Sequence, residues 1–213
     1  MAYDNANSRW MMVGLQRVMP AETPHYAWLA YSSGSDLSTA TWTFTHVSTA
    51  SSSQSAYGIA YDSVNNYWYV TGGYYTGANT AVLWYSNNPT GGTGAWTKIT
   101  LESGGTPNAT GLIYDSENYR WLVSGYTYNG SNYDVALWYS SGNNLTSATF
   151  SRQDVDNDGD SEYSWSIFKD PNQNKYYLAN YSSGSTGGFW PVQVSSDSSL
   201  TLPSSISVKS EGA

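Results

Sequence analysis

The sequence contains no cysteine among its 213 residues. No disulfide bond supports the fold, therefore, and no thiol chemistry is available to the chain. Large all-β domains stand without disulfides, so this absence indicates neither secretion nor retention inside a cell.

Positive charge is also scarce. The sequence has 8 Lys and Arg against 16 Asp and Glu, which gives a net charge of −8. Phosphate binding needs clustered Lys or Arg, so we expect no nucleic acid as a partner. An anionic membrane surface is disfavoured for the same reason.

Long apolar segments and helical patterns are missing as well. No apolar run approaches the ~20 residues that span a bilayer, so we expect no membrane insertion. The first residues, Met1-Ala2-Tyr3-Asp4, show no basic region and no apolar segment, so no signal peptide is visible. No apolar stripe recurs at helical spacing. Twenty Tyr and ten Trp instead accompany many Ser, Thr, Gly and Asn residues, which favours strands joined by turns and predicts an all-β fold.

The chain repeats one unit four times, over about 1–55, 56–108, 109–162 and 163–213. In each copy an Asp is followed six positions later by an aromatic residue: Asp4/Trp10, Asp62/Trp68, Asp115/Trp121 and Asp170/Tyr176. A Tyr-Ser pair comes later in the first three copies, at Tyr31-Ser32, Tyr85-Ser86 and Tyr139-Ser140. A further aromatic residue follows it at Trp42, Trp96 and Phe150, and the fourth copy is degenerate there.

Each unit is predicted to form a four-stranded antiparallel sheet. In the second copy we expect strands over about 57–61, 67–72, 81–86 and 95–101. Alternation places Trp68 and Val70 on one face of the second strand, with Tyr67 and Tyr69 on the other. Apolar residues on both faces suit a blade packed between two neighbours, so we predict one β-propeller domain over 1–213. We expect the repeated tryptophans in its core: Trp10, Trp42, Trp68, Trp96 and Trp121.

The segment from the Tyr-Ser pair to the next aromatic residue resembles a degenerate Asp-box turn of the sialidase-like (BNR) propellers. It reads Tyr85-Ser86 through Gly94-Ala95-Trp96-Thr97 in the second copy and Tyr31-Ser32 through Thr41-Trp42-Thr43 in the first. The turns here are longer than the family's and mostly lack its Asp. The resemblance therefore implies the blade architecture and leaves the family's activity aside.

The chain begins within the first strand of a repeat, so its two ends together complete one copy. This arrangement suits a four-bladed ring closed by the chain's own termini. The alternative is an arc that other chains complete, since unpaired edges are otherwise a liability.

An acidic segment lies at the end of the third repeat. It runs Asp154-Val155-Asp156-Asn157-Asp158-Gly159-Asp160-Ser161-Glu162, with oxygen-bearing residues at alternate positions and a Gly at the sixth. The pattern resembles the calcium loops of integrin-type propeller blades. This resemblance implies one calcium ion, held by the side chains of Asp154, Asp156, Asp158 and Glu162 and the carbonyl of Asp160. The alternative is a solvated acidic loop.

Aromatic residues gather where a propeller would join its second and third strands, on the same side as the acidic segment. We expect a ligand-binding surface there, formed by Tyr74, Tyr75, Tyr126, Tyr128, Tyr133 and Trp190, with Tyr181 and Phe189 nearby. The first copy has the longest such connection, which carries Arg17 and His25. Sugar rings and protein partners both stack on exposed aromatic side chains. The alternative is that these rings merely cover loop backbone.

No catalytic residues are predicted. Sialidases hold their substrate with three arginines, whereas Arg9 and Arg120 occupy equivalent places in two repeats and would not converge. We expect a non-enzymatic structural or adhesive module located in a virion or outside the cell. Its composition resembles that of phage fibres, knobs and capsid decorations, and its expected partners are copies of itself or other proteins of the assembly. The alternatives are a lectin-like glycan binder and, third, a sialidase-like hydrolase.

Overall fold

The computed structural model describes residues 1–17, 25–48, 53–76, 78–155, 161–170, 172, 175–182, 188–194 and 200–201. Over these residues the chain forms strands and one short 3-10 helix, η1, at Thr93–Ala95. None of the helical structure in this part of the chain has the length and apolar character to cross a membrane. The all-β prediction is confirmed.

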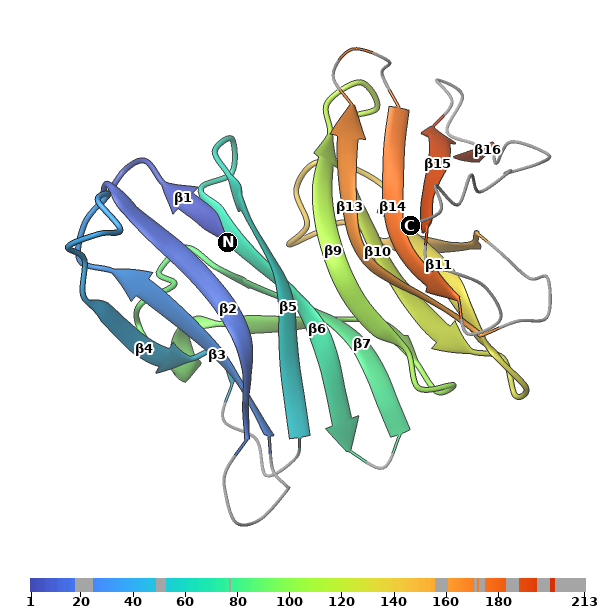
Figure 1. Cartoon of the computed structure of the whole chain (residues 1–213), viewed down its shortest axis with the longest axis horizontal. Coiled ribbons are helices and arrows are strands. Elements are labelled where there is room, and N and C mark those ends of the chain that lie inside the picture. Colours follow the sequence, from blue (N-terminus) through green and yellow to red (C-terminus); the bar gives the residue numbers. More distant parts are fainter. Residues whose placement is uncertain are drawn as a thin grey trace, which may run out of the picture. The chain divides into compact units, whose positions relative to one another are not determined.

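The strands form four antiparallel sheets, each made of four strands that follow one another in the chain (Figure 1). The first sheet contains β1 (Ala2–Asp4), β2 (Arg9–Arg17), β3 (His25–Ser32) and β4 (Trp42–His46). The second contains β5 (Ser53–Asp62), β6 (Tyr67–Thr76), β7 (Ala78–Ser86) and β8 (Thr97–Ser103). The third contains β9 (Asn108–Asp115), β10 (Arg120–Tyr128), β11 (Tyr133–Ser140) and β12 (Phe150–Asp154). The fourth contains β13 (Glu162–Asp170), β14 (Lys175–Ser182), β15 (Gly188–Val194) and β16 (Leu200–Thr201).

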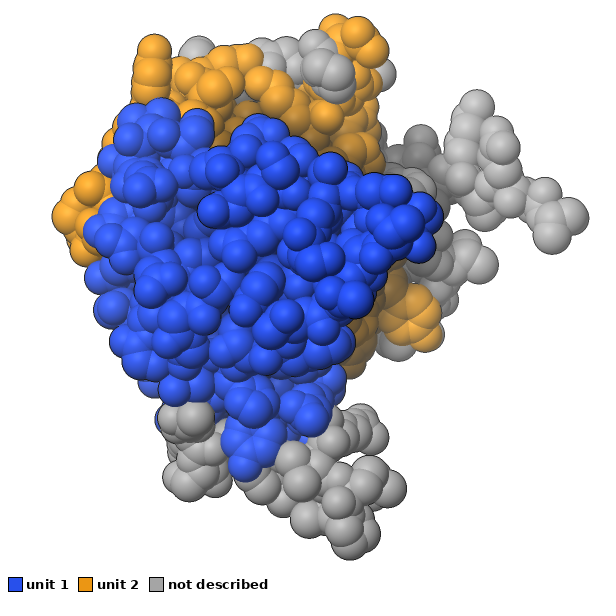
Figure 2. All heavy atoms as spheres, turned by 90° about the vertical axis from the view of Figure 1, so that its left-hand side faces the viewer, with its two compact units in different colours: residues 1–109 blue, residues 110–213 orange. Residues whose placement is uncertain are grey.

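The chain divides into two compact units, residues 1–109 and 110–213 (Figure 2). Unit 1 holds the first and second sheets. Unit 2 holds the fourth sheet and the third, whose strand β9 begins just before the boundary. The repeat of one four-stranded sheet is confirmed, while the single domain over 1–213 stays a prediction.

The two sheets of unit 1 pack face to face. Met11 and Leu29 of the first sheet lie in one buried cluster with Trp68 and Val70 of the second. Trp68 and Val70 share a face, as the alternation of β6 predicts. Burying a side chain of this size stabilises the fold by about 1.5–3 kcal/mol, so this cluster holds the two sheets together.

Unit 2 repeats this packing with equivalent residues. Leu122 and Leu137 of the third sheet form a buried cluster with Tyr176 and Leu178 of the fourth. Leu122 occupies the repeat position of Met11, and Tyr176 that of Trp68. In both units, therefore, one face of the leading sheet meets the opposite face of the sheet that follows it.

The predicted core tryptophans are buried at three of five positions. Trp68, Trp96 and Trp121 are buried, whereas Trp10 and Trp42 are only half-buried, so the prediction is wrong for these two. Alternation along the first sheet puts Trp10 and Trp42 on the face opposite Met11. That face does not point toward the second sheet.

The repeated Asp closes the turn between the first two strands of its sheet. Asp115 Oδ1 accepts hydrogen bonds from the backbone N–H of Glu117 at 3.2 Å and of Asn118 at 3.4 Å. Its Oδ2 accepts one from Asn118 Nδ2 at 2.7 Å. The other copies show the same kind of bond, from Asn7 to Asp4, from Val64 and Asn65 to Asp62, and from Asn172 to Asp170. Local side-chain bonds of this type fix tight turns.

The repeated Ser fastens the same end of the sheet, where the third strand ends beside the start of the second. Ser140 Oγ accepts a hydrogen bond from the backbone N–H of Trp121 at 2.8 Å and donates one to the carbonyl of Gly142 at 2.6 Å. Ser32 makes the equivalent bonds, with Trp10 and Gly34. The markers that define the repeat in the sequence are thus residues that shape each sheet.

In the second and third sheets the connections between the second and third strands are shorter than predicted. Tyr74 and Tyr75 lie in β6, Tyr126 and Tyr128 in β10, and Tyr133 in β11, so the prediction that they occupy loops is wrong. Tyr181, Phe189 and Trp190 also lie in strands, β14 and β15. The pairing continues to Thr76–Ala78 in one hairpin and to Tyr128–Tyr133 in another. Aromatic and β-branched residues favour extended backbone, which carries the ladders further than the turn residues suggest.

Candidate functional site

Six aromatic side chains contact one another in unit 2, and we call this group the aromatic surface. It consists of Tyr126 and Tyr128 of β10, Tyr133 of β11, Tyr163 and Trp165 of β13, and Tyr181 of β14. The shortest separations between ring centroids, 4.9 Å, join Tyr163 to Tyr126 and to Tyr133. All of these separations fall in the range of favourable aromatic pairs.

Three of these rings are open to solvent. The exposed fraction is 37% for Tyr128, 50% for Trp165 and 51% for Tyr181. Tyr126 is buried beneath its neighbours and supports the group from below. The aromatic surface thus combines a packed base with accessible ring faces.

An irregularity in β13 contributes to this arrangement. The pairing of β13 with β14 shifts register between Ser164 and Ser166, which makes Trp165 the bulge residue of β13. Such bulges re-aim a side chain and raise the local twist of a strand. The neighbouring pair Tyr163–Tyr181 stays in register, so the bulge brings Trp165 beside an ordered cross-strand pair.

The aromatic surface is uncharged at neutral pH. Burial raises the pKa of the Tyr163 hydroxyl, and the neighbouring Tyr133 and Tyr181 raise it further. The phenol therefore stays protonated and offers one hydrogen-bond donor. Stacking and single hydrogen bonds, rather than ion pairing, are the interactions that these six residues can supply.

The predicted ligand-binding residues separate into two groups. Tyr126, Tyr128 and Tyr133 come together in the aromatic surface. Tyr74 and Tyr75 lie in unit 1, where Lys98 Nζ sits 3.8 Å from the centre of the Tyr74 ring. For Trp190, the structure describes the backbone in β15 but not the side chain.

Two members of the aromatic surface, Tyr163 and Trp165, were not predicted from the sequence. The signal was present as two aromatic residues spaced by one Ser at the start of a repeat, a spacing that puts both side chains on one side of a strand. Their neighbours on β10 and β11 are distant in sequence, and only the packing of the third sheet on the fourth brings them together.

The acidic segment is described only at its two ends. Asp154, the last residue of β12, forms an ion pair with Arg152, with Nε and Oδ1 3.0 Å apart. Glu162 is the first residue of β13 and is buried. Asp156, Asp158 and Asp160 lie outside the described residues. The part of the chain that is described holds no group of three His, Cys, Asp or Glu residues suited to a metal, and the calcium site stays a prediction.

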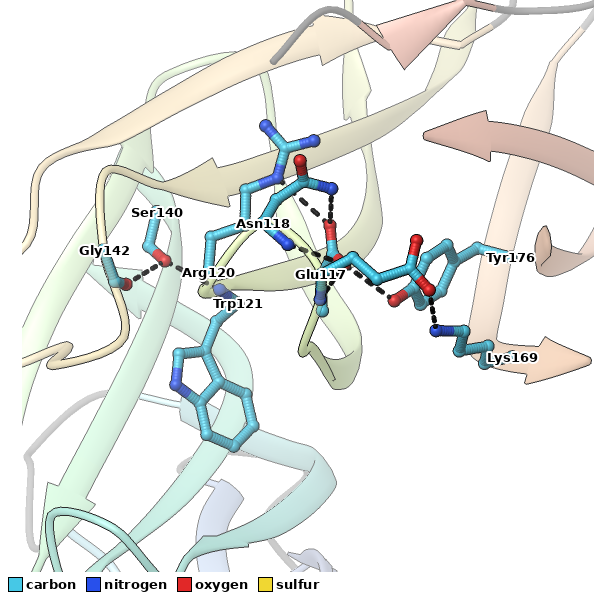
Figure 3. Close-up of polar contacts among 9 residues, drawn as sticks. Glu117, Asn118, Arg120, Trp121, Ser140, Gly142, Lys169 and Tyr176 are labelled. Carbon is cyan, nitrogen blue, oxygen red and sulfur yellow. Dashed lines mark hydrogen bonds and ion pairs between the residues drawn. The ribbon is translucent and has the colours of Figure 1, made fainter. Parts of the chain in front are cut away.

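Polar and charged residues of the third and fourth sheets form a local network with Asp115, and Figure 3 labels its members Glu117, Arg120, Lys169 and Tyr176. Arg120 Nε lies 3.3 Å from Asp115 Oδ2, and both side chains are buried. Tyr176 donates a hydrogen bond to Asp115 Oδ1 at 3.0 Å. Burial raises the pKa of the Tyr176 hydroxyl, and the charge of Asp115 raises it further. Lys169 pairs with Glu117 at 3.0 Å at the edge of this network.

The arginines pair within their own sheets. Arg9 contacts Asp4 at 3.0 Å in the same way that Arg120 contacts Asp115. With Arg152 bound to Asp154, three of the four arginines in the sequence have an Asp of the same sheet as partner. These three stabilise turns and strand ends rather than forming one anion-binding group.

A comparison with protein-family models and a search of curated proteins each found no match to this chain.

Proposed function

We propose that this chain is a non-enzymatic, adhesive β-propeller module of an extracellular assembly, and that it adheres through the aromatic surface of unit 2. The composition favours a phage virion as that assembly, with the chain as a fibre, knob or capsid decoration. Its partners in the assembly are copies of itself or other structural proteins.

One observation carries the proposal. Tyr128, Trp165 and Tyr181 expose ring faces while the other members of the group hold them in place. Aromatic rings bind with large contact areas and lose little conformational entropy, so grouped exposed rings favour adhesion to a partner. Grouped apolar exposure of this kind is typical of interaction sites.

The propeller architecture is supported by the order of packing. In each unit the sheet face that holds Met11, or its equivalent Leu122, packs on the face of the next sheet that holds Trp68, or its equivalent Tyr176. We call these the Met11-type face and the Trp68-type face. A ring of blades repeats this contact at every step around its axis. The resemblance of the repeats to sialidase-like blades favours the same architecture.

A lectin-like glycan binder is the second candidate and uses the same surface. Tyr163 and Trp165 lie within 20° of parallel with their centroids 6.4 Å apart, next to the exposed ring of Tyr181. Adjacent, nearly parallel rings suit the flat faces of sugars. A sialidase-like hydrolase is disfavoured because Arg9, Arg120 and Arg152 are engaged by local carboxylates.

The test compares the unaltered protein with the double variant Trp165→Ala/Tyr181→Ala on a glycan array and in sedimentation with assembled particles. The control is Tyr119→Asn, which removes an exposed ring outside the group. Asn suits this position, where φ is +51°, because the equivalent residue of the second repeat is Asn66, which also has a positive φ. We expect particle association that the double variant reduces at least tenfold and the control leaves unchanged. Glycan binding with no particle association would favour the lectin, and retention of all binding by the double variant would overturn the aromatic surface as the site.

A further inference from the structure

Unit 1 contains a cavity of about 370 Å³ at the position that the aromatic surface occupies in unit 2. Its walls come from both sheets of the unit. The lining residues are Leu15, His25, Ser53, Ser55, Tyr57 and Tyr75. A volume of this size lies at the lower end of the range for small-molecule sites in proteins.

The repeat explains why this cavity exists. His25 donates its backbone N–H to Ser53 Oγ at 3.2 Å, and Tyr133 makes the equivalent bond to Ser161 Oγ at 3.3 Å. Tyr57 in β5 is a bulge residue, as Trp165 is in β13. The two places are therefore equivalent in the two units.

Smaller side chains in unit 1 leave the space open. Ser55 stands at the repeat position of Tyr163, and Leu15 at that of Tyr126. In unit 2 these two tyrosines pack against each other at 4.9 Å. The cavity is the volume that their absence from unit 1 leaves unfilled.

The walls of the cavity are fixed by hydrogen bonds. Tyr75 donates to Asn108 Oδ1 at 2.6 Å, and burial raises the pKa of its phenol, which stays protonated. Asn108 reaches this position because residue 73 is Gly: a Cβ there would lie 2.0 Å from Asn108 Oδ1. This side of the cavity is thus built before any ligand arrives.

One wall residue has an unused polar atom. His25 Nε2 is buried and has no hydrogen-bond partner in the structure. Native proteins pair nearly all such atoms with protein groups, water or ligands. A ligand hydroxyl can serve this nitrogen whichever tautomer the imidazole adopts, because a hydroxyl both donates and accepts.

We propose that the cavity binds one neutral sugar ring. The lining offers hydroxyl groups, an imidazole and aromatic faces, and none of the six residues carries a charge when His25 is neutral. An apolar ligand would leave His25 Nε2 unpaired, and an anion would find no cation among these six residues. The site is separate from the aromatic surface and goes beyond the adhesive function proposed above.

The experiment measures binding of separate neutral sugars, D-galactose, D-glucose, L-fucose and N-acetyl-D-glucosamine, by ligand-observed NMR and calorimetry. D-glucuronate and N-acetylneuraminate serve as acidic comparisons. Ser55→Tyr introduces the residue of the equivalent place in unit 2 and fills the cavity. Ser63→Tyr, at an exposed turn of the same sheet, is the matched control.

We expect saturable binding of at least one neutral sugar, lost at least tenfold in Ser55→Tyr and kept in Ser63→Tyr. His25→Phe removes the unpaired nitrogen and should weaken binding about threefold to tenfold. This variant provides the test if Ser55→Tyr does not fold. The Trp165→Ala/Tyr181→Ala variant should bind as the unaltered protein does, which separates this site from the aromatic surface. No saturable binding of a neutral sugar, preference for the acidic sugars, or binding that survives Ser55→Tyr and His25→Phe would overturn the proposal.

Discussion

Asp115 has no exposed surface, and its carboxylate gathers donors from three directions. Backbone N–H groups of the turn, the Arg120 guanidinium and the Tyr176 hydroxyl all bond to it. Tyr176 belongs to the fourth sheet, so one side chain both shapes a turn of the third sheet and links it to its neighbour. A buried carboxylate needs such partners, because an unpaired charge away from water is costly.

Asp115→Ala should therefore be strongly destabilising. It leaves the Arg120 guanidinium buried without the carboxylate partner, and removing one member of a buried ion pair costs about 3–5 kcal/mol. Urea denaturation followed by tryptophan fluorescence measures the change in the free energy of unfolding. Glu117→Ala breaks the half-exposed pair with Lys169 at the same turn and should cost less than about 1 kcal/mol. Equal losses in the two variants would contradict this account of Asp115.

The buried tyrosines predict a loss of stability in alkali. Tyr75 and Tyr176 have raised pKa values in the folded chain, whereas an unfolded tyrosine ionises near pH 10. Above about pH 10 the unfolded state loses these protons and the folded state keeps them, so the free energy of unfolding falls as the pH rises. Urea denaturation between pH 8 and pH 11 should show a plateau followed by a decline. The decline should be shallower in Tyr176→Phe, and an unchanged slope would argue against this residue as a cause.

At the scale of the strand, the bulges at Tyr57 and Trp165 and the glycines beside them decide how closely strands approach. A Cβ at Gly72 would lie 1.9 Å from the carbonyl oxygen of Ser55 and 2.7 Å from the Trp84 ring. The close contact with backbone cannot be relieved by moving a flexible side chain.

Gly72→Ala should for this reason destabilise the second sheet by about 1–3 kcal/mol or more, because overpacking forces the strands apart. Gly34→Ala is the control, since no atom lies within 4 Å of the added methyl group. It should change the free energy of unfolding by no more than about 0.5 kcal/mol. Thermal and urea denaturation of both variants provide the comparison, and a neutral Gly72→Ala would show that this pairing is looser than described.

The acidic segment between β12 and β13 gives a prediction for calcium. If the segment holds the ion, a chelator should lower the melting temperature, since a ligand that binds only the folded state stabilises it, and added calcium should restore it. Asp158→Asn should reduce the response, whereas Asp36→Asn, in an exposed turn of the first sheet, should not. A melting curve that is the same in chelator and in calcium would contradict the calcium site.

The repeated sheet could be predicted from the sequence because the residues that mark each repeat make contacts within their own sheet. Asp62 and Ser140 act within their own sheets, so each repeat carries its own evidence. Strand ends were less predictable, since residues such as Tyr75 and Tyr128 extend a ladder beyond the apparent turn. The cavity, and Tyr163 and Trp165 of the aromatic surface, escaped prediction because they depend on contacts between sheets, such as that of Tyr126 with Tyr163.

At the scale of the whole molecule, the first and the fourth sheet each carry an aromatic pair on the face that no sheet of their own unit covers. On the first sheet the Trp68-type face carries Trp28 and Phe44, with rings 5.5 Å apart and Phe44 64% exposed. On the fourth sheet the Met11-type face carries Phe168 and Tyr177, also 5.5 Å apart. These are the two kinds of face that meet inside each unit. The proposed propeller therefore predicts that they meet each other, within one chain or between copies.

The absence of native cysteine allows this prediction to be measured directly by spin labelling and double electron–electron resonance. Ala6, Val64 and Asn172 are exposed and hold the same repeat position in the first, second and fourth sheets. The pair Ala6→Cys/Val64→Cys calibrates the distance between neighbouring blades. The propeller predicts an equally short distance between Ala6→Cys and Asn172→Cys. If the ring closes within one chain, the doubly labelled chain shows this distance. If copies complete the ring, a mixture of chains labelled at Ala6→Cys alone and chains labelled at Asn172→Cys alone shows it. A distance well beyond the calibrating pair in both experiments would contradict the propeller.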